Sequence, residues 1–460
     1  MDRRRFLVGG AALATLAGRA WAEVDDLRTA AREAWLYGLP LIELARLRAA
    51  AIGANPSAGT PGYNAFAHSR EPAGPASRDF SAPEVDVLYS GAWINLAAGG
   101  AKLYVPPGGG RYVSLTVTDM YGNVLASLDG AASGHAAREL TLAPPPARVG
   151  VAGYTATMPR MPTLGPAIRA PGPWVWALAR TQFVGAADLP NARALQDQLD
   201  IRVRARPATA APTAPLDAAW SDYFWAVQQL IDENPPPATE VNFFRRIAPL
   251  QLGEDGGFEQ ARFADPDIGG IVTGVEDGRT LAAQARADPA AGAWVYPQSD
   301  FGDFGMDVLY RARSVLSNPG APPAARVTTL RAAGPGGALT FPAGGFYHLS
   351  LPEPPPADAF WTLTLYEATP DGRLFLADTP SRQHALGDRS AELKRRPDGG
   401  IDIWIGRSDP GGARSSNWLA APARGAFALL LRAYAPGGAI TERRYHPPPV
   451  ELLGGATRRH

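Results

Sequence analysis

The sequence lacks cysteine altogether, and this absence removes several classes of site at once. With no cysteine among its 460 residues, the chain can form no disulfide bond, thiolate nucleophile, zinc-thiolate site or iron-sulfur cluster. It also contains no Gly-x-Ser-x-Gly elbow, no P-loop and no dinucleotide-binding fingerprint, which are short motifs of common hydrolase and nucleotide sites. We therefore predict a protein that uses no cofactor.

Histidine is scarce, and the spacing of the histidines in the sequence does not indicate a metal site. No two histidines form a His-Glu-x-x-His or a His-x-His pattern, which would bring two ligands onto one face of an element. The six histidines lie far apart, at His68, His135, His348, His384, His446 and His460. A site assembled in space from His68 with Asp79 or Asp86 stays open, but our prediction is that no metal is bound.

Neither sign of charge predominates in the sequence. Basic and acidic residues each number 44, so the formal net charge is zero. Proteins that bind a phosphate backbone carry a positively charged face or a cluster of basic residues, and the sequence contains no run of more than three consecutive basic residues. We therefore predict no nucleic-acid partner.

The first 22 residues are typical of a targeting segment. Arg3 and Arg4 fit a twin-arginine pattern, the apolar run 6–16 is short for a bilayer span, and Ala20-Trp21-Ala22 supplies small residues for cleavage. We expect residues 1–22 to be a twin-arginine-type signal peptide and the mature chain to be periplasmic. No span is predicted in the mature chain.

Short alternating runs of apolar and polar residues indicate β-strands. Trp361, Leu363 and Leu365 alternate with Thr362 and Thr364, and successive strand residues point to opposite faces of a sheet. The run 113–118 alternates in the same way, so we expect one buried and one polar face there. Together with frequent Pro, Gly and Asp-Gly turns, this pattern predicts antiparallel sandwiches or jelly rolls.

Helical patterns occupy the start and the middle of the chain. A helix capped at Asp25 or Asp26 is expected to run to about Tyr37, with Pro40 interrupting it. An amphipathic helix is predicted over residues 216–232. The fold class is therefore mainly β with accessory helices, comprising two antiparallel β-sandwich or jelly-roll-like domains joined by a helical connector. The expected divisions are an N-terminal β domain with leading helices at 23–206, the connector at 207–325 and a C-terminal jelly-roll-like domain at 326–460.

Several of these segments resemble a known two-domain family. The run Phe-Trp-Thr-Leu-Thr-Leu-Tyr at 360–366 and Asn-Trp-Leu at 417–419 are similar to its C-terminal DUF1214 domain, while the segments 33–41, 86–93 and 110–119 resemble its N-terminal DUF1254 domain. The resemblance covers nearly the whole mature chain and implies two domains in an exported protein. Both domains are defined as having unknown function, so the resemblance implies no particular reaction.

The first candidate site lies at residues 84–90. In a strand, Glu84 and Asp86 would share a face about 7 Å apart, and two such carboxylates can divide into an acid and a base. Asp86 and Tyr89 match the family pattern, so we assign Asp86 as acid or base and Tyr89 as a proton donor. Structural pairing at a domain edge is the alternative for these residues.

The remaining candidates are arginines that could anchor an anionic group and side chains that could contact a ligand. Arg311 and Arg382 complete the predicted catalytic set, with Asp86 and Tyr89. A cap or an ion pair is the alternative role for Arg311. The predicted ligand-binding residues are His68, Ser90, Asn417 and Trp418. For Asn417 and Trp418, a structural corner is the alternative, because asparagine often holds turns and tryptophan often fills cores.

Two hypotheses for function follow from these candidates. The first is a cofactor-independent, hydrolase-like enzyme that acts on a small or medium organic substrate between the two β domains. The alternative is a non-catalytic protein that binds carbohydrate or another ligand, or an envelope-associated protein, with Tyr366, Trp404 and Trp418 as an aromatic platform. The sequence leaves open whether the protein is an enzyme, and aromatic-rich β surfaces are compatible with a homodimer.

Overall fold

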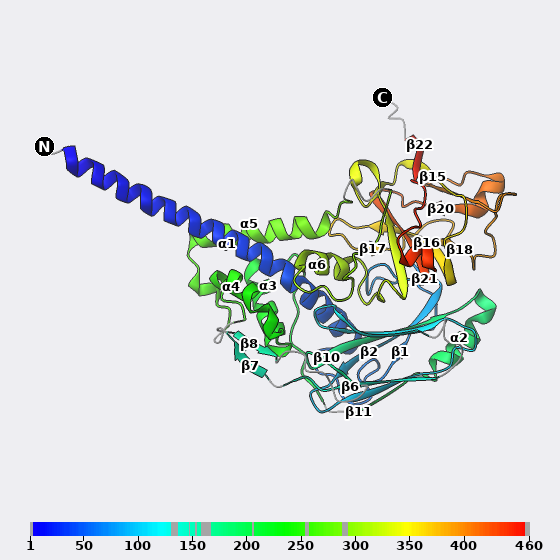
Figure 1. The fold of residues 1–460 in the computed structure, drawn as a ribbon, viewed down its shortest axis with the longest axis horizontal. Coiled ribbons are helices and arrows are strands. Elements are labelled where there is room, and N and C mark those ends of the chain that lie inside the picture. Colours follow the sequence, from blue (N-terminus) through cyan, green and yellow to red (C-terminus); the bar gives the residue numbers. More distant parts are fainter. Residues whose placement is uncertain are drawn as a thin grey trace.

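The fold combines several β-sheets with a set of helices and is mainly β (Figure 1). It is given by a computed structural model, which describes residues 3–129, 137–146, 148–151, 154–157, 167–204, 207–253, 257–287 and 293–455. A long helix, α1 (Arg3–Ile52), projects from the body at its N-terminal end (Figure 1). Of the helices in the part of the chain that is described, none is long and apolar enough to span a bilayer.

The N-terminal part of the chain forms two main sheets that share one apolar core. The first sheet has the order β1-β2-β10-β4-β5 and the second has the order β11-β3-β6-β9, while β7 pairs with β8. Side chains from both main sheets belong to the same buried cluster. The strands are β1 Ala67–His68, β2 Val87–Asn95, β3 Ala101–Val105, β4 Val113–Asp119, β5 Val124–Asp129, β6 Arg138–Ala143, β7 Arg148–Val151, β8 Tyr154–Thr157, β9 Ile168–Arg169, β10 Trp174–Gln182 and β11 Asp200–Val203.

The first sheet is covered on both faces, which corrects the expectation of a polar face on β4. Val113, Leu115 and Val117 face the core that the two sheets share, as the alternation predicts. Thr116 and Thr118, on the other face, are also almost fully buried, because Trp176 and Leu178 of the neighbouring strand belong to a second core that includes the helices. A strand buried on both faces can therefore still alternate between apolar and small polar residues.

The helices form a layer of their own around the C-terminal half of α1. α1 packs along α5 and also contacts α3, α4 and α6. A β-carbon at Gly274 of α5 would collide with the backbone carbonyl of Arg28, so the two helices approach closely where this glycine stands. The helices are α2 Leu189–Gln196, α3 Trp220–Glu233, α4 Val241–Ile247, α5 Asp265–Ala283, α6 Val308–Ser317 and α7 Gly438–Thr441, with short 3-10 turns between several of them.

Pro40 does not interrupt α1, which corrects the predicted break. Proline removes one backbone donor and crowds the preceding turn, at a cost of about 3 kcal/mol in a helix interior. The helix nevertheless continues to Ile52, because Tyr37, Leu39 and Leu41 beside the proline are at most 1% exposed. Burial of these side chains in the helical layer outweighs the local cost.

The C-terminal part of the chain again has two sheets around one core. The larger sheet runs β12-β13-β21-β16-β17, with β14 beside β21 and β18 beside β16, and the smaller runs β20-β19-β15-β22. Trp361, Leu363 and Leu365 of β16 share a core with Ile403 and Ile405 of β19, which confirms the alternation in these strands. The strands are β12 Trp294–Val295, β13 Val327–Ala332, β14 Phe341–Pro342, β15 Gly345–Leu351, β16 Ala357–Ala368, β17 Leu374–Phe375, β18 Ala385–Gly387, β19 Ile401–Gly406, β20 Trp418–Ala420, β21 Ala426–Pro436 and β22 Glu451–Gly455.

The structure supports the broad prediction of a mainly β protein with helices. The finer expectations, namely a jelly-roll arrangement and a helical connector that separates two domains, stay predictions, as do the proposed domain boundaries. We call the sheets of the N-terminal part and the sheets of the C-terminal part the two sheet regions.

Candidate functional site

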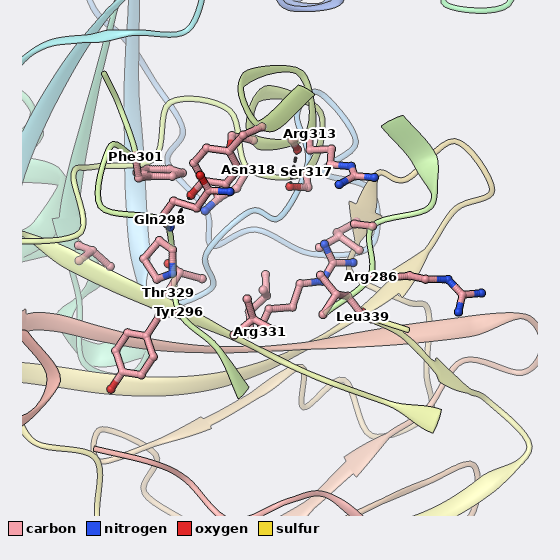
Figure 2. Close-up of a pocket in the computed structure, with 18 residues that line it drawn as sticks. Arg286, Tyr296, Gln298, Phe301, Arg313, Ser317, Asn318, Thr329, Arg331 and Leu339 are labelled. Carbon is pink, nitrogen blue, oxygen red and sulfur yellow. Dashed lines mark hydrogen bonds between the residues drawn. The ribbon is translucent and has the colours of Figure 1, made fainter. Parts of the chain in front are cut away.

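A cavity of about 220 Å³ opens between the helical layer and the larger C-terminal sheet. Its walls come from the residues that follow α5, from α6, from the chain around β12, and from strands β13, β17 and β21. Figure 2 shows that Arg331 extends from its strand toward the part of the cavity where Arg313 and Ser317 lie, whereas Arg286 reaches away from it. We call this cavity the arginine pocket.

The pocket is lined by three arginines, Arg286, Arg313 and Arg331, which bond to backbone carbonyls rather than to carboxylates. Arg331 Nε donates to the Leu339 carbonyl oxygen at 3.1 Å. Arg313 Nε and Nη2 both donate to the Leu281 carbonyl at 3.0 and 2.7 Å. No aspartate or glutamate lines the pocket among the residues that the structure describes. The positive charge of the pocket is therefore not balanced by an acidic side chain in its described walls.

Burial makes this unbalanced charge costly. Removal from water and, to a smaller extent, the positive charge of Arg313 together lower the pKa of Arg331 to about 10. Burial likewise lowers the pKa of Arg313, although Asp307 opposes the change. Because a desolvated cation is stabilised by a nearby opposite charge, an anion in the pocket would stabilise both guanidinium groups.

The rest of the pocket is apolar or carries uncharged polar groups. Val295, Val327, Leu374 and Leu430 supply apolar wall. The Tyr310 hydroxyl accepts a hydrogen bond from the backbone N–H of Gln298 at 2.9 Å. The described walls contain no histidine, so neither an imidazole nor a carboxylate is placed there to act as a general base.

Two of the predicted catalytic residues lie where the two sheet regions meet. Glu84 is 3% exposed and accepts hydrogen bonds from Arg180 Nε of β10 at 2.8 Å and from the Tyr434 hydroxyl of β21 at 2.7 Å. Arg432 Nη1 donates to the Tyr366 hydroxyl at 2.6 Å. We call these five side chains the interdomain network: Glu84, Arg180, Tyr366, Arg432 and Tyr434. The predicted residues Asp86 and Tyr89 lie next to it.

Asp86 lies beside this network and is not part of its bonding. Strand β2 begins at Val87, so Glu84 and Asp86 precede the strand, which corrects the expected strand geometry. Burial, followed by the negative charge of Glu84, raises the pKa of Asp86 to about 7. Burial also opposes ionisation of Glu84, but Arg180 and Arg432 outweigh it and hold its pKa below the usual value. The pKa values of the two carboxyl groups therefore differ, because that of Glu84 is lowered and that of Asp86 is raised.

Asp86 is poorly placed to meet a substrate. The residue as a whole is only half-buried, yet its Oδ2 atom is closed to solvent and has no hydrogen-bond partner among the described residues. The Tyr89 hydroxyl accepts a hydrogen bond from the Glu84 backbone N–H at 2.8 Å, which holds the segment before β2 in place. For Tyr89, this contact corresponds to the structural pairing that we considered as the alternative.

Arg311 and Arg382 lie elsewhere in the molecule. Arg311 is 1% exposed and stands on α6, where its guanidinium lies 4.9 Å from the centre of the Tyr37 ring and 3.5 Å from Glu240 Oε1. Arg382 is not buried and adopts a left-handed backbone conformation with φ of 53° in a turn of the C-terminal region. The structure thus divides the predicted catalytic set among three places rather than one cleft.

The predicted ligand-binding residues mainly form hydrogen bonds that hold the protein's own backbone in place. His68 Nδ1 lies 2.8 Å from Ser90 Oγ, and Ser90 is fully buried. Asn417 accepts from the Lys394 N–H at 2.8 Å and donates to the carbonyls of Lys394 and Asp402. Trp418 Nε1 donates to the Gly406 carbonyl at 2.9 Å. Asn417 and Trp418 therefore form a structural corner.

The expected aromatic platform is wrong, because its three rings do not share an open face. Tyr366 is fully buried and Trp418 is 7% exposed. Trp404 is half-buried, and its ring is stacked against His348 with ring centres 4.3 Å apart. Within the described parts of the chain, no group of three or more histidine, aspartate or glutamate side chains is placed to hold a metal ion. His135 and His460 lie outside the described residues.

The arginine pocket was missed because its walls are far apart in the sequence. They extend from Ala285 to Leu430, and only the fold brings them together. One local signal was present: in β13, Thr329 and Arg331 are separated by two positions and are both half-buried, between fully buried neighbours. An arginine between two apolar residues of a strand, as Arg331 is between Leu330 and Ala332, is a signal that a sequence search could use.

These features define a protein of two sheet regions with a helical layer and a cationic cavity. The chain belongs to the DUF1254/DUF1214 two-domain family of unknown function: residues 63–203 match the family described as "Protein of unknown function (DUF1254)" and residues 336–438 match "Protein of unknown function (DUF1214)". Together the matched residues make up more than half of the chain.

The comparison with solved structures finds one that is similar in fold and another that aligns less well. A crystal structure of the VPA0106 protein from Vibrio parahaemolyticus has a TM-score of 0.60 at 17% identity, covering 93% of this chain and all of that chain. A crystal structure of an uncharacterized protein from Burkholderia cenocepacia has a TM-score of 0.42 at 15% identity, covering 95% of this chain and 97% of that one. No curated protein matches the chain.

Proposed function

We propose that this protein binds a small organic anion in the arginine pocket. The observation that carries the proposal is the environment of Arg331, which bonds to one backbone carbonyl, lies near the like charge of Arg313 and has no acidic side chain among the described lining residues. A guanidinium group presents parallel N–H donors that match a carboxylate. The ligand supplies the negative charge that the described walls lack.

The shape and chemistry of the pocket narrow the class of ligand. A cavity of about 220 Å³ accommodates a small molecule, and apolar side chains such as Val295 and Leu430 line it beside the arginines. Binding pockets of this kind combine an apolar surface with a few polar groups that fix the orientation of the ligand. We therefore propose a carboxylate or similar anion attached to a compact apolar body.

Binding without catalysis is the role that the pocket favours. A hydrolase needs a base or a nucleophile that is activated by one, and the described walls of the pocket hold neither histidine nor carboxylate. A hydrolase-like activity is our second candidate, and the single observation that favours it is the pKa of Asp86 near 7. For that activity, the Asp86→Asn variant should lose turnover while keeping its fold.

Export to the periplasm is also part of the proposal. It is supported by Arg3 and Arg4, by the short apolar run 6–16 and by the Ala20-Trp21-Ala22 cleavage pattern. N-terminal sequencing of protein recovered from the periplasm of an expression host should begin at Glu23. A variant with both arginines replaced by lysine should stay in the cytoplasm as the longer chain.

The binding proposal is tested by thermal unfolding with matched charged and neutral compounds. Benzoate should raise the apparent stability of the wild type, by about 2.7 kcal/mol at 100 times its dissociation constant, whereas the neutral isostere benzamide should not. Arg331→Gln should abolish the benzoate effect, and Arg407→Gln, which alters an exposed arginine, should preserve it. Equal stabilisation by benzamide, or an unchanged response of Arg331→Gln, would contradict the proposal.

A further inference from the structure

A short segment that precedes β2 runs between the arginine pocket and the interdomain network. We call this segment, Ser81–Glu84, the strap. It belongs to the N-terminal part of the chain, but its contacts reach α6, β17 and β21 of the later part. The strap therefore joins two features of the molecule that lie far apart in the sequence.

Ser81 holds two walls of the arginine pocket from behind. The residue is fully buried. Its Oγ donates to the carbonyl of Ser317, at the end of α6, at 3.0 Å and accepts from the backbone N–H of Leu374 in β17 at 2.8 Å. Ser317 and Leu374 both line the pocket. One hydroxyl group thus fixes the spacing between a helix wall and a strand wall.

Ala82 continues the strap in a strained backbone conformation. Its φ of 54° lies in the left-handed region, which a residue with a β-carbon adopts only when surrounding contacts hold it there. Here the Ala82 N–H donates to the Leu374 carbonyl at 2.7 Å, and the Ala82 carbonyl accepts from Arg432 Nη2 at 2.9 Å. The same residue is therefore held by the pocket wall on one side and by the network on the other.

Glu84 completes the connection at the far end of the strap. Its carboxylate binds Arg180 of the N-terminal sheet and Tyr434 of the C-terminal sheet. All four residues of the strap are buried. Its position is held by these hydrogen bonds and by the packing of Ala82 in a small cluster with Tyr366, Leu374 and Leu430. Leu374 and Leu430 are also walls of the pocket.

We propose that Ser81 is a positioning residue for the arginine pocket, and that the strap couples occupancy of the pocket to the contact between the two sheet regions. The inference rests on the proposed function. Any contact that fixes the spacing of Ser317 and Leu374 lowers the free energy needed to form the binding-competent pocket. By reciprocity, an anion that holds those walls stabilises the strap.

The coupling is tested first by affinity. The dissociation constant of benzoate, measured by isothermal titration, should rise about tenfold in Ser81→Ala, within the usual range of coupling between sites. Ser81 bonds to the pocket walls and is not itself one of the lining residues, so the change reports on the walls. Ser416→Ala, which removes an exposed serine hydroxyl, is the matched control and should bind like the wild type.

A second measurement uses the wild type alone, so it tests the coupling even if the Ser81→Ala variant does not fold. Benzoate should slow amide hydrogen exchange at Ala82 and Leu374, whose N–H groups hold the strap to β17. A purely structural role of Ser81 predicts no dependence of these amides on benzoate. The exposed amide of Gly411, which bonds to Asp409, should exchange at the same rate with and without benzoate.

The two proposals fail in different ways. If the wild type does not bind benzoate or another carboxylate of similar size, the proposed function fails. If the wild type binds benzoate through Arg331 but exchange at Ala82 and Leu374 is unchanged by it, the coupling is overturned and the binding function stands. Equal affinities of a folded Ser81→Ala variant and the wild type would also overturn the coupling.

Discussion

The interdomain network and the arginine pocket use the same side chain in opposite circumstances. In the network, Arg180 and Arg432 are 1% exposed and share the buried carboxylate of Glu84 and the hydroxyls of two tyrosines. In the pocket, Arg331 and Arg313 have backbone carbonyls as hydrogen-bond acceptors and no acidic side chain in the described lining. The first arrangement contains a carboxylate of the protein itself, whereas the described walls of the pocket contain none.

This difference in surroundings distinguishes an arginine that stabilises the fold from one that is available to bind a ligand. Burial penalises a guanidinium group in both places, but neighbouring groups reverse the penalty only in the network. There, the pKa of Arg432 is raised despite burial, through Tyr366, Tyr434 and Glu84, whereas the pKa of Arg331 is lowered to about 10. Arg331 is also less buried than Arg432, but the sign of the pKa change follows the charge that surrounds each group.

The largest effect is expected from breaking the network. Glu84→Ala removes the carboxylate and leaves Arg180 and Arg432 buried without it. Removing one partner of a buried ion pair typically costs about 3 to 5 kcal/mol, because the remaining charge is left uncompensated. Equilibrium unfolding in urea measures the loss of the free energy of unfolding.

The control for this variant is Glu367→Ala. Glu367 pairs with Arg78 on the surface, where both side chains are at least 36% exposed, and exposed pairs contribute about 0 to 1 kcal/mol. A loss of stability in Glu84→Ala that is no larger than in the control would show that the network does not hold the sheet regions together.

A smaller and pH-dependent effect is expected at Asp86, beside the network. Its pKa is raised to about 7 in the folded protein, against about 3.9 in an unfolded chain. Between these values the folded state keeps a proton that the unfolded state has released, so this group's contribution to stability falls as pH rises from about 4 to 7. Asp86→Asn should therefore be more stable than the wild type at pH 8, by up to a few kcal/mol.

Unfolding curves at several pH values measure this contribution as a difference between variant and wild type. That difference removes the effects of other titrating groups, which both proteins share. A difference that does not change between pH 4.5 and 8 would mean that Asp86 ionises in the folded protein much as it does in water.

The smallest change in stability is expected in the pocket itself. Arg331→Gln removes a desolvated charge that Arg313 repels, at the expense of one hydrogen bond to the Leu339 carbonyl. These two effects oppose each other, so the ligand-free variant should differ from the wild type by less than about 1 kcal/mol. A loss of stability as large as that expected for Glu84→Ala would mean that Arg331 stabilises the fold, as Arg432 does. The contrast between the arginine pocket and the interdomain network would then be wrong.

Sequence patterns predicted the local elements well where one residue period dominated. The strand over Trp361 and Leu365 and the helix over Phe224 and Ile231 are both present with the expected buried faces. The break at Pro40 was wrong because long-range burial in the helical layer decided the outcome, and this burial has no local signature.

The candidate sites were harder to predict, because they depend on charge balance in space. The sequence predicted that the pKa values of Glu84 and Asp86 would differ. In the structure they do, because the pKa of Asp86 is raised and that of Glu84 is lowered. The sequence could not reveal that Glu84 would be bound by Arg180 and Tyr434, residues about 100 and 350 positions away. Nor could it show that the described walls around Arg331 would contain no carboxylate.

Isothermal titration of benzoate and of benzamide into the wild type and Arg331→Gln tests the central claim most directly. If the pocket arginines lack a negative charge that a ligand supplies, the wild type should bind benzoate at least tenfold more tightly than benzamide. The preference should vanish in Arg331→Gln. Equal affinities for the charged and neutral compounds in the wild type, or a preference that survives loss of Arg331, would contradict the account.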